Sequence, residues 1–291
     1  MPMGGLSRTI EVETFMKNAG LVLPMHDGAR IPQIGLGVMF VSNEDLPGLM
    51  RDAVELGYRH FDTATHYSNE AGVGEGLRAL DIDRDDLFVT TKLPNDGHGF
   101  DATLRAFDAS EAAIGRIDLY LLHWPQPPMG VYRESWRAMV QLKREGRVRS
   151  IGVSNFPPSL IEEIEAETGE LPVVNQIQVH PFHQQAEARA YHAQRGIITE
   201  SWSPLAHGRV LADPVIAAIA ERHGCSTAEV VLRWHLLNDL VIIPKAASRH
   251  HLASNLSIPE IALSAEDLTA LAALERPEGR IGPDPMVHVT V

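Results

Sequence analysis

Four side chains that can exchange protons or support proton transfer follow one another at the ends of apolar runs. The stretch RHFDTATHYSNE (59–70) places Asp62 and Tyr67 close together in the chain. Lys92 ends the run LFVTTK, and His123 ends IDLYLLH. An ammonium group near a phenol favours the phenolate, so Lys92 should lower the pKa of Tyr67 from its usual value of about 10. Such a phenol is suited to donate a proton to an oxygen on which negative charge develops.

The other two groups have supporting chemistry. Asp62 would keep the ammonium group of Lys92 charged and in place, and His123 can hydrogen-bond the oxygen of a bound carbonyl. Each residue alone has an ordinary structural interpretation, as a helix cap, a buried ion pair or a core histidine. The group contains no nucleophile and no metal cluster. We therefore predict a shared proton-donating site that needs a hydride from a second molecule.

Eight short apolar runs, each followed by a helical pattern, would position these side chains. The predicted strands are 34–38, 59–62, 87–92, 117–123, 148–154, 174–179, 197–202 and 240–245. The predicted helices are 43–57, 70–79, 101–115, 132–145, 158–167, 185–195 and 249–256, two that open at Asp213-Pro214 and at Ser226, and one after Ser264. Many strands are apolar on both faces, as covered parallel strands are. Eight such units in about 250 residues predict an α/β fold, a single-domain (β/α)8 TIM barrel, with a doubly wound sheet as the structural alternative.

In such a barrel the active site lies at the carboxyl ends of the strands. The candidate residues at or near these ends are, in chain order, Asp62, Tyr67, Lys92, His123, Asn155, Gln176, Trp202 and Lys245. If the barrel closes, these residues converge on one rim. The predicted strand 59–62 then places Asp62 at the rim, and the loop after this strand places Tyr67 above Asp62.

Composition limits the other classes of function. The 291 residues include 38 acidic and 25 basic side chains, a net charge of −13, so a general nucleic-acid or anionic-membrane binder is not expected. The sequence contains no run of 18 apolar residues, so no membrane span is predicted. Cys225 is the only cysteine, which excludes an intrachain disulfide and fits the cytoplasm. Residues 1–20 lack the core of a signal peptide and are interpreted as an N-terminal extension before a domain of residues 21–291.

Seven motifs resemble the aldo-keto reductases, in order and at the spacing of that family. They are GYRHFDTATHYSNEAGVGEGL, TTKLPNDGHG, LYLLHWP, EGRVRSIGVSNF, NQIQVHPF, SWSPLAHG and IPKAASRHHLASNL, and the resemblance covers roughly residues 21–285. The ending GRIGPDP and the motif SWSPL are most similar to the bacterial branch that contains 2,5-diketo-D-gluconate reductases. The resemblance implies a monomeric (β/α)8 barrel that reduces an aldehyde or ketone, such as a keto-sugar acid, with NADP(H).

The resemblance also assigns residues to roles. It implies a catalytic tetrad of Asp62, Tyr67, Lys92 and His123, with Tyr67 as the general acid. It implies cofactor contacts from Ser154, Asn155 and Gln176 to the carboxamide, from Trp202 to the nicotinamide ring, from Ser203, Leu205 and Gly208 to the pyrophosphate, and from Lys245, Ser248 and Asn255 to the adenosine phosphate. It places Met39, Phe40, His123 and Trp124 at the substrate pocket, whose shape also depends on the tail after Gly282. No metal is implied.

Three departures from the family pattern bear on specificity. Met39 and Phe40 stand where relatives often carry a tryptophan after GLGV. Ala246 replaces a frequent serine, and His251 replaces a usual arginine that would grip a phosphate through two parallel hydrogen bonds. Arg249 would supply a guanidinium if its side chain turned inward. We therefore expect NADP(H) to be preferred and NAD(H) to be used as well.

Several other interpretations compete with this one. The sequence GVGEG (72–76) lacks the spacing and the preceding strand of a dinucleotide-binding fingerprint. A metal-dependent barrel hydrolase would draw its ligands from among His60, His66, His123, His180 and His183, yet Lys245 stands where an acidic ligand is needed. A Schiff-base lyase would need an uncharged Lys92, which Asp62 disfavours. A cofactor-binding regulatory barrel without physiological turnover remains the non-enzymatic alternative.

Overall fold

Eight parallel strands form one continuous sheet in the computed structural model, which describes residues 21–246 and 248–289. In chain order the strands are β3 (Leu36–Gly37), β4 (His60–Asp62), β5 (Phe88–Leu93), β6 (Ile117–Leu122), β7 (Val148–Ser154), β8 (Val174–Gln178), β9 (Ile198–Trp202) and β10 (Val241–Ile242). Each strand pairs with the next one in the chain. The predicted N-terminal extension, residues 1–20, lies outside the described residues.

The sheet closes on itself between its first and last strands. Ile34 forms a parallel bridge with Ile242, where the amide of Gly35 donates to the carbonyl of Ile242 over 2.8 Å. The amide of Ile242 in turn donates to the carbonyl of Gln33 over 2.9 Å. The sheet is therefore a barrel, as predicted, and the doubly wound alternative is wrong. Every residue of β5 and β6 is buried, as expected for strands that are covered on both faces.

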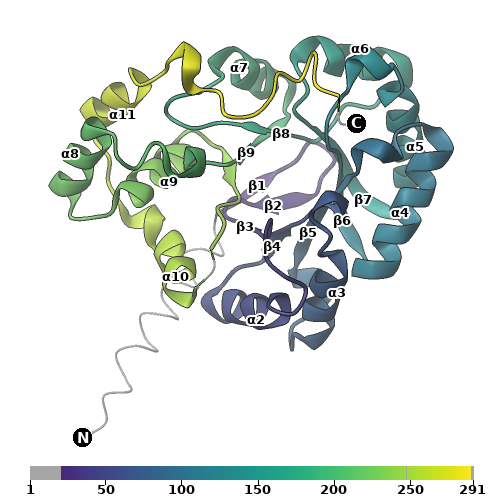
Figure 1. The fold of residues 1–291 in the computed structure, drawn as a ribbon, viewed down its shortest axis with the longest axis horizontal. Helices are drawn as coiled ribbons and strands as arrows, with labels where there is room; N and C mark the ends of the chain where they lie inside the picture. Colours follow the sequence, from purple (N-terminus) through teal and green to yellow (C-terminus); the bar gives the residue numbers. More distant parts are fainter. Residues whose placement is uncertain (1–20, 247, 290–291) are drawn as a thin grey trace, which may run out of the picture.

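Helices surround the barrel in a ring (Figure 1). They are α2 (Leu46–Leu56), α3 (Glu70–Ala79), α4 (Phe100–Ile114), α5 (Tyr132–Arg144), α6 (Pro158–Thr168), α7 (Ala186–Arg195), α8 (Pro214–His223), α9 (Thr227–Leu237), α10 (Arg249–Ser257) and α11 (Ala265–Ala272). Short 3-10 turns are η1 (Thr65–Tyr67), η2 (Arg84–Asp86), η3 (Asn95–Gly97), η4 (Pro127–Met129), η5 (Ala206–Gly208), η6 (Ile258–Glu260) and η7 (Pro277–Gly279).

The helix-start signals in the sequence act as predicted. The Asp213 side chain accepts from the amide of Val215 at the start of α8. Ser226 and Glu229 form a reciprocal capping box at the start of α9. A run of apolar residues on one face of α5 packs toward the strands, with Trp136 and Met139 fully buried.

A hairpin before the barrel, formed by β1 (Val22–Pro24) and β2 (Arg30–Pro32), was not among the predicted elements. Its turn contains Asp27-Gly28, and Gly28 has a φ of 88°, which glycine adopts without strain. Met25 and Ile31 pack with residues near the starts of the strands, including Phe88 and Val174. The hairpin thus covers the amino ends of the strands, opposite the predicted site.

Candidate active site

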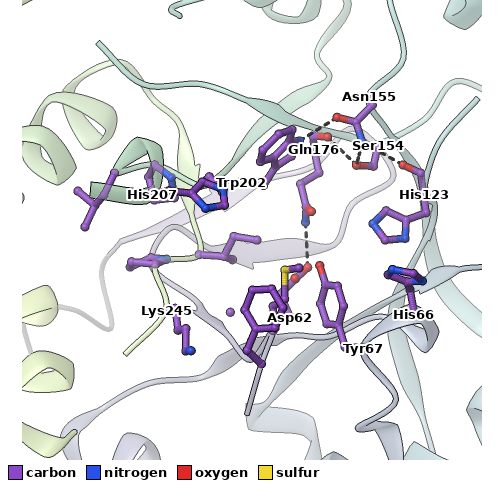
Figure 2. Close-up of a pocket in the computed structure, with 18 of the residues that line it drawn as sticks. Asp62, His66, Tyr67, His123, Ser154, Asn155, Gln176, Trp202, His207 and Lys245 are labelled. Atoms are coloured by element: carbon purple, nitrogen blue, oxygen red, sulfur yellow. Dashed lines mark hydrogen bonds between the residues drawn. The ribbon is translucent and has the colours of Figure 1, made fainter. Parts of the chain in front are cut away.

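A cavity of about 660 Å³ lies at the carboxyl ends of the strands, within the size range of small-molecule and cofactor sites. Its lining includes Met39, Phe40, Asp62, Tyr67, His123, Trp124, Ser154, Asn155, Gln176, Trp202, Ser203, Leu205, Gly208 and Lys245. Figure 2 shows Asp62, Tyr67 and His123 on one side of this cavity and Lys245 and His207 on the other. The structure thus brings together most residues that the sequence placed at one rim.

Asp62 and Lys92 form a buried ion pair. Lys92 Nζ donates to Asp62 Oδ1 over 2.6 Å and to the carbonyl of Thr63 over 2.9 Å, and the lysine side chain is fully buried. β4 and β5 are neighbours in parallel register, with Asp62 opposite Thr90, and Lys92 lies two residues further along β5 on the same face as Thr90. Burial alone would lower the pKa of Lys92, but Asp62 and Tyr67 outweigh it and raise the pKa, so the amine stays charged.

Tyr67 lies above this pair at the end of η1, with its ring centroid 5.2 Å from Lys92 Nζ. The net pKa shift differs from the prediction. Burial raises the pKa of Tyr67, and Lys92 lowers it only in part, so the net direction is upward. The prediction treated the lysine charge alone and omitted desolvation, which is the larger effect here. The phenol therefore keeps its proton at neutral pH, which is the form that a proton donor needs.

His123 is held as a neutral imidazole beside the phenol. Its ring meets that of Tyr67 edge to face, with centroids 6.2 Å apart. Burial and the charge of Lys92 hold the pKa of His123 well below its usual value. A neutral imidazole retains one N–H that can donate a hydrogen bond.

Ser154, Asn155 and Gln176 hydrogen-bond one another beside the cavity. Ser154 Oγ donates to the carbonyl of Gln176 over 2.8 Å, and Asn155 Nδ2 donates to Ser154 Oγ and to the carbonyl of His123, each over 3.0 Å. Asn155 has a φ of 63°, a left-handed conformation that is tolerated best by glycine and asparagine. Both amide hydrogens of Asn155 are thus engaged within the protein. Its oxygen accepts from the indole of Trp202 over 2.8 Å.

Trp202 lies between the cavity and the part of the C-terminal tail at Gly282. The tail crosses from α11 past α7 over this end of the barrel (Figure 1). Gln178 Oε1 anchors the tail by accepting from the amides of Ile281 and Gly282, over 3.2 and 2.9 Å. A Cβ at Gly282 would lie 2.6 Å from an indole carbon of Trp202, so only glycine allows this approach. The indole is therefore fixed by a hydrogen bond and by the packed tail.

The loop after β9 has an uncommon backbone. Ser203, Ala206 and His207 have φ values of 48°, 50° and 52°, which cost free energy in residues other than glycine. Ser203, Leu205 and Gly208, which the sequence analysis assigned to the pyrophosphate, line the cavity. His207 also lines it, and its Nε2 lies 3.2 Å from Ser203 Oγ. The sequence analysis missed His207, although it lies within the quoted motif SWSPLAHG.

The far end of the cavity agrees less well with prediction. Lys245 is exposed at the rim, with Nζ 5.6 Å from the ring centroid of Phe40. Ser248 caps α10 by accepting from the amide of His251. The lining of the cavity, within the described part of the chain, includes Lys245 but neither the Ser248 nor the His251 side chain.

Arg249 and Asn255 also have partners away from the cavity. Arg249 Nη1 pairs with Glu55 over 2.8 Å and with Asp52 over 3.1 Å, both on α2. The condition under which Arg249 would supply a guanidinium, an inward-turned side chain, is not met in this structure, because two carboxylates on α2 attract the guanidinium. Asn255 is buried and hydrogen-bonds Tyr58.

The substrate side contains the predicted Met39, Phe40 and Trp124 and further residues that the sequence analysis missed. His66 and Asn95 line the cavity, and so does His288 from the tail. The rings of Trp124 and His288 meet with centroids 4.7 Å apart. The pairing joins the loop after β6 to the end of the chain. Local spacing carries no signal for such a contact.

Glu200 was also missed, and it lies inside the barrel next to the ion pair. It is fully buried, and its Oε2 accepts from Gln176 Nε2 over 3.0 Å. Side chains alternate along a strand, so Glu200 and Trp202 point the same way from β9. The alternation of side chains along β9 could therefore have indicated from the sequence that Glu200 faces the barrel interior, as Trp202 does.

A closed barrel with a protonated phenol above a buried lysine–carboxylate pair contains the groups that general acid chemistry at an oxygen requires. Among the described residues, no three His, Cys, Asp or Glu side chains form a group able to hold a metal ion. No helix of the described part is long and apolar enough to cross a membrane.

The chain belongs to the aldo/keto reductase family, whose model matches residues 33–276. It is 42% identical to methylglyoxal reductase DkgA from Escherichia coli over 266 residues, which cover 91% of this chain and 96% of that protein. The solved structure of a mutant of Gox0644 in complex with NADPH superimposes with a TM-score of 0.87 at 48% identity, over 91% of this chain and 97% of that one. A putative 2,5-diketo-D-gluconic acid reductase B has a TM-score of 0.86 at 34% identity, over 92% of this chain and 96% of that one. The predicted family and fold are confirmed.

Proposed function

We propose that this protein reduces an aldehyde or ketone with NADP(H), and that Tyr67 is the proton donor. The observation that carries the proposal is the buried phenol of Tyr67, 5.2 Å from the ammonium of Lys92 and facing the cavity that Trp202 also lines. Two relatives support it. One solved structure holds NADPH, and one curated relative is named a methylglyoxal reductase.

The cavity fits a nicotinamide dinucleotide. Its lining extends from Asp62 and Tyr67 to Lys245 and to the loop residues Leu205, His207 and Gly208. The indole of Trp202 offers an aromatic surface, and Lys245 offers a point charge for a phosphate. Gln176 has an amide oxygen at the cavity wall that can accept a hydrogen bond from a carboxamide, and the Asn155 oxygen, which already accepts from Trp202, has a second lone pair. The bound cofactor would supply the hydride.

The protein's own residues would do the rest of the chemistry. The Tyr67 hydroxyl donates its proton to the carbonyl oxygen, and the ammonium of Lys92 stabilises the phenolate that forms. Asp62 keeps Lys92 charged and in position. The neutral imidazole of His123 donates a hydrogen bond to the same oxygen without adding a second positive charge beside Lys92.

The proposed cofactor preference is moderate. Lys245 is an exposed cation at the far rim, while Arg249 is paired with carboxylates on α2. We propose NADPH as the preferred cofactor and NADH as a second one, with a keto-sugar acid among the candidate substrates. A monomeric state and a cytoplasmic location remain predictions.

A panel of aldehydes, ketones and keto-sugar acids, measured with both cofactors in wild type and Tyr67→Phe, tests the proposal. The variant should bind NADPH normally and lose turnover by about 10²- to 10⁴-fold, as is typical when a general acid is removed. Wild-type turnover in the variant would contradict the role of Tyr67. Binding of NADPH without oxidation by any carbonyl would favour the regulatory alternative.

A further inference from the structure

A second buried carboxyl group is joined to the Asp62–Lys92 pair through one amide. Gln176 Nε2 donates one hydrogen to Asp62 Oδ2 over 2.8 Å and the other to Glu200 Oε2 over 3.0 Å. An amide nitrogen carries two hydrogens, so both are used. Figure 2 shows the link from Gln176 to Asp62, both of which line the cavity. Asp62 thus accepts from Lys92 on one oxygen and from Gln176 on the other.

The charge balance around Glu200 is unequal. Groups facing it are His60 and Asp62 from β4, Lys92 from β5 and Tyr67 from η1. Lys92 is the only Lys or Arg that is buried among the described residues, and it pairs with Asp62. Burial lowers the pKa of His60 to about 3, so this imidazole is neutral.

Glu200 therefore lacks a cation of its own. Its Oε1 has no hydrogen-bond partner among residues 21–246 and 248–289, and lies 3.8 Å from the neutral His60 ring. An ionised carboxylate there would be a buried charge without compensation. Burial and the neighbouring Asp62 raise the pKa of Glu200 to about 8, so the side chain is mostly a neutral acid at pH 7.

We propose that Glu200 is a positioning residue whose neutral form holds the Gln176 amide, and through it Asp62 and Lys92, in the arrangement that supports proton donation by Tyr67. The role rests on the proposed function of Tyr67. With Glu200 neutral, the core formed by Asp62 and Lys92 has no net charge, and loss of the Tyr67 proton adds one negative charge. With Glu200 ionised, the same step adds a second like charge in a buried place and is slowed.

Glu200→Gln tests this role because glutamine keeps the size and the acceptor oxygen but cannot ionise. We expect kcat of the variant to lie within about 3-fold of wild type at pH 6–7. Above pH 9, wild-type kcat should fall as Glu200 ionises, and the variant should exceed it by about 10-fold, the factor for one pK unit of interaction. KM for the carbonyl should change little. Glu200→Ala, which leaves Gln176 without an acceptor, should be slower at every pH.

Glu70→Gln is a matched control. Glu70 is also a buried carboxyl group, but it accepts from Thr91 and Ser110 on the outer side of β5. Its variant should keep the alkaline loss of kcat seen in wild type. Superimposable profiles of wild type and Glu200→Gln, with Tyr67→Phe inactive, would overturn the role of Glu200. Near-normal turnover of Tyr67→Phe would instead overturn the proposed proton donor.

Thermal unfolding gives a second readout that needs no turnover. The pKa of Glu200 is raised on folding, so the unfolded chain ionises first and wild-type stability should fall as pH rises from about 4.5 to 8. Glu200→Gln lacks this component. The Tm of the variant relative to wild type should therefore increase across that range. A constant Tm difference would show that Glu200 ionises freely in the folded protein, and would overturn the proposal.

Discussion

The two ends of the cavity are built differently. At the catalytic end, Asp62 and Lys92 come from neighbouring strands and are almost completely buried. At the far end, Lys245, Ser248 and His251 lie after β10 or on α10 and are exposed. Charges interact strongly in the low-dielectric interior, whereas exposed charges are screened by water. The comparison indicates that the barrel itself determines the geometry of the proposed catalytic groups. The geometry of the far end depends on which groups its exposed side chains contact.

Replacing one lysine at each end gives the largest expected contrast. Lys92→Met leaves the Asp62 carboxylate buried without its cation, and breaking such a pair costs about 3–5 kcal/mol. Lys245→Met removes an exposed charge and should change the free energy of unfolding by no more than about 0.5 kcal/mol. Urea unfolding of both variants at pH 7 measures the difference. If the two variants lost equal free energy of unfolding, the two ends of the cavity would not differ in the strength of their charge interactions.

Trp202 lies between the two ends, and we expect its fluorescence to report cofactor binding. Its indole is fixed by Asn155 and by the approach of Gly282, so NADPH stacked on it should quench tryptophan fluorescence. Trp202→Ala should abolish most of that quench. Trp234→Phe is the control, because Trp234 is buried in α9 and does not line the cavity. A quench that survives in Trp202→Ala and disappears in the control would refute the stacking position.

The smallest effects are expected at α10. His251→Arg should increase the preference for NADPH over NADH by about 10-fold, since a guanidinium forms two charged hydrogen bonds with a phosphate. Arg249→Ala should change the preference by less than about 3-fold, because that guanidinium already pairs with Asp52 and Glu55, in exposed pairs of low energy. The ratio of kcat/KM for the two cofactors measures both. A larger effect from Arg249 than from His251 would show that the guanidinium rotates when cofactor binds.

Prediction from sequence succeeded where the signal is local. Apolar runs marked all eight barrel strands, and the pairs Asp213-Pro214 and Ser226–Glu229 marked two helix starts. Because parallel strands present their carboxyl ends at one rim, Asp62, Lys92 and Trp202 could be placed together before any coordinates were known. The hairpin of β1 and β2 was missed because each strand has only three residues and lies outside the strand–helix repeat.

Prediction failed where a side chain had several possible partners. Arg249 would have contributed a guanidinium only if its side chain faced the cavity, but it pairs instead with two carboxylates on α2 that lie almost two hundred positions earlier in the chain. The lowered pKa predicted for Tyr67 was wrong in sign because the degree of burial cannot be obtained from a five-residue spacing. The contact of His288 with Trp124 was missed because the two residues are distant in the chain.

The sequence by itself determined the barrel, the order of its elements and the identity of the groups at its rim, because periodicity and helix caps act over a few residues. Only the tertiary structure decided how those groups are charged and oriented. The amide of Gln176 reaches Asp62 across 114 positions of the chain, and the tail reaches Gln178 across 104. Desolvation and partner choice depend on everything that surrounds a side chain, and that environment exists only once the barrel has closed.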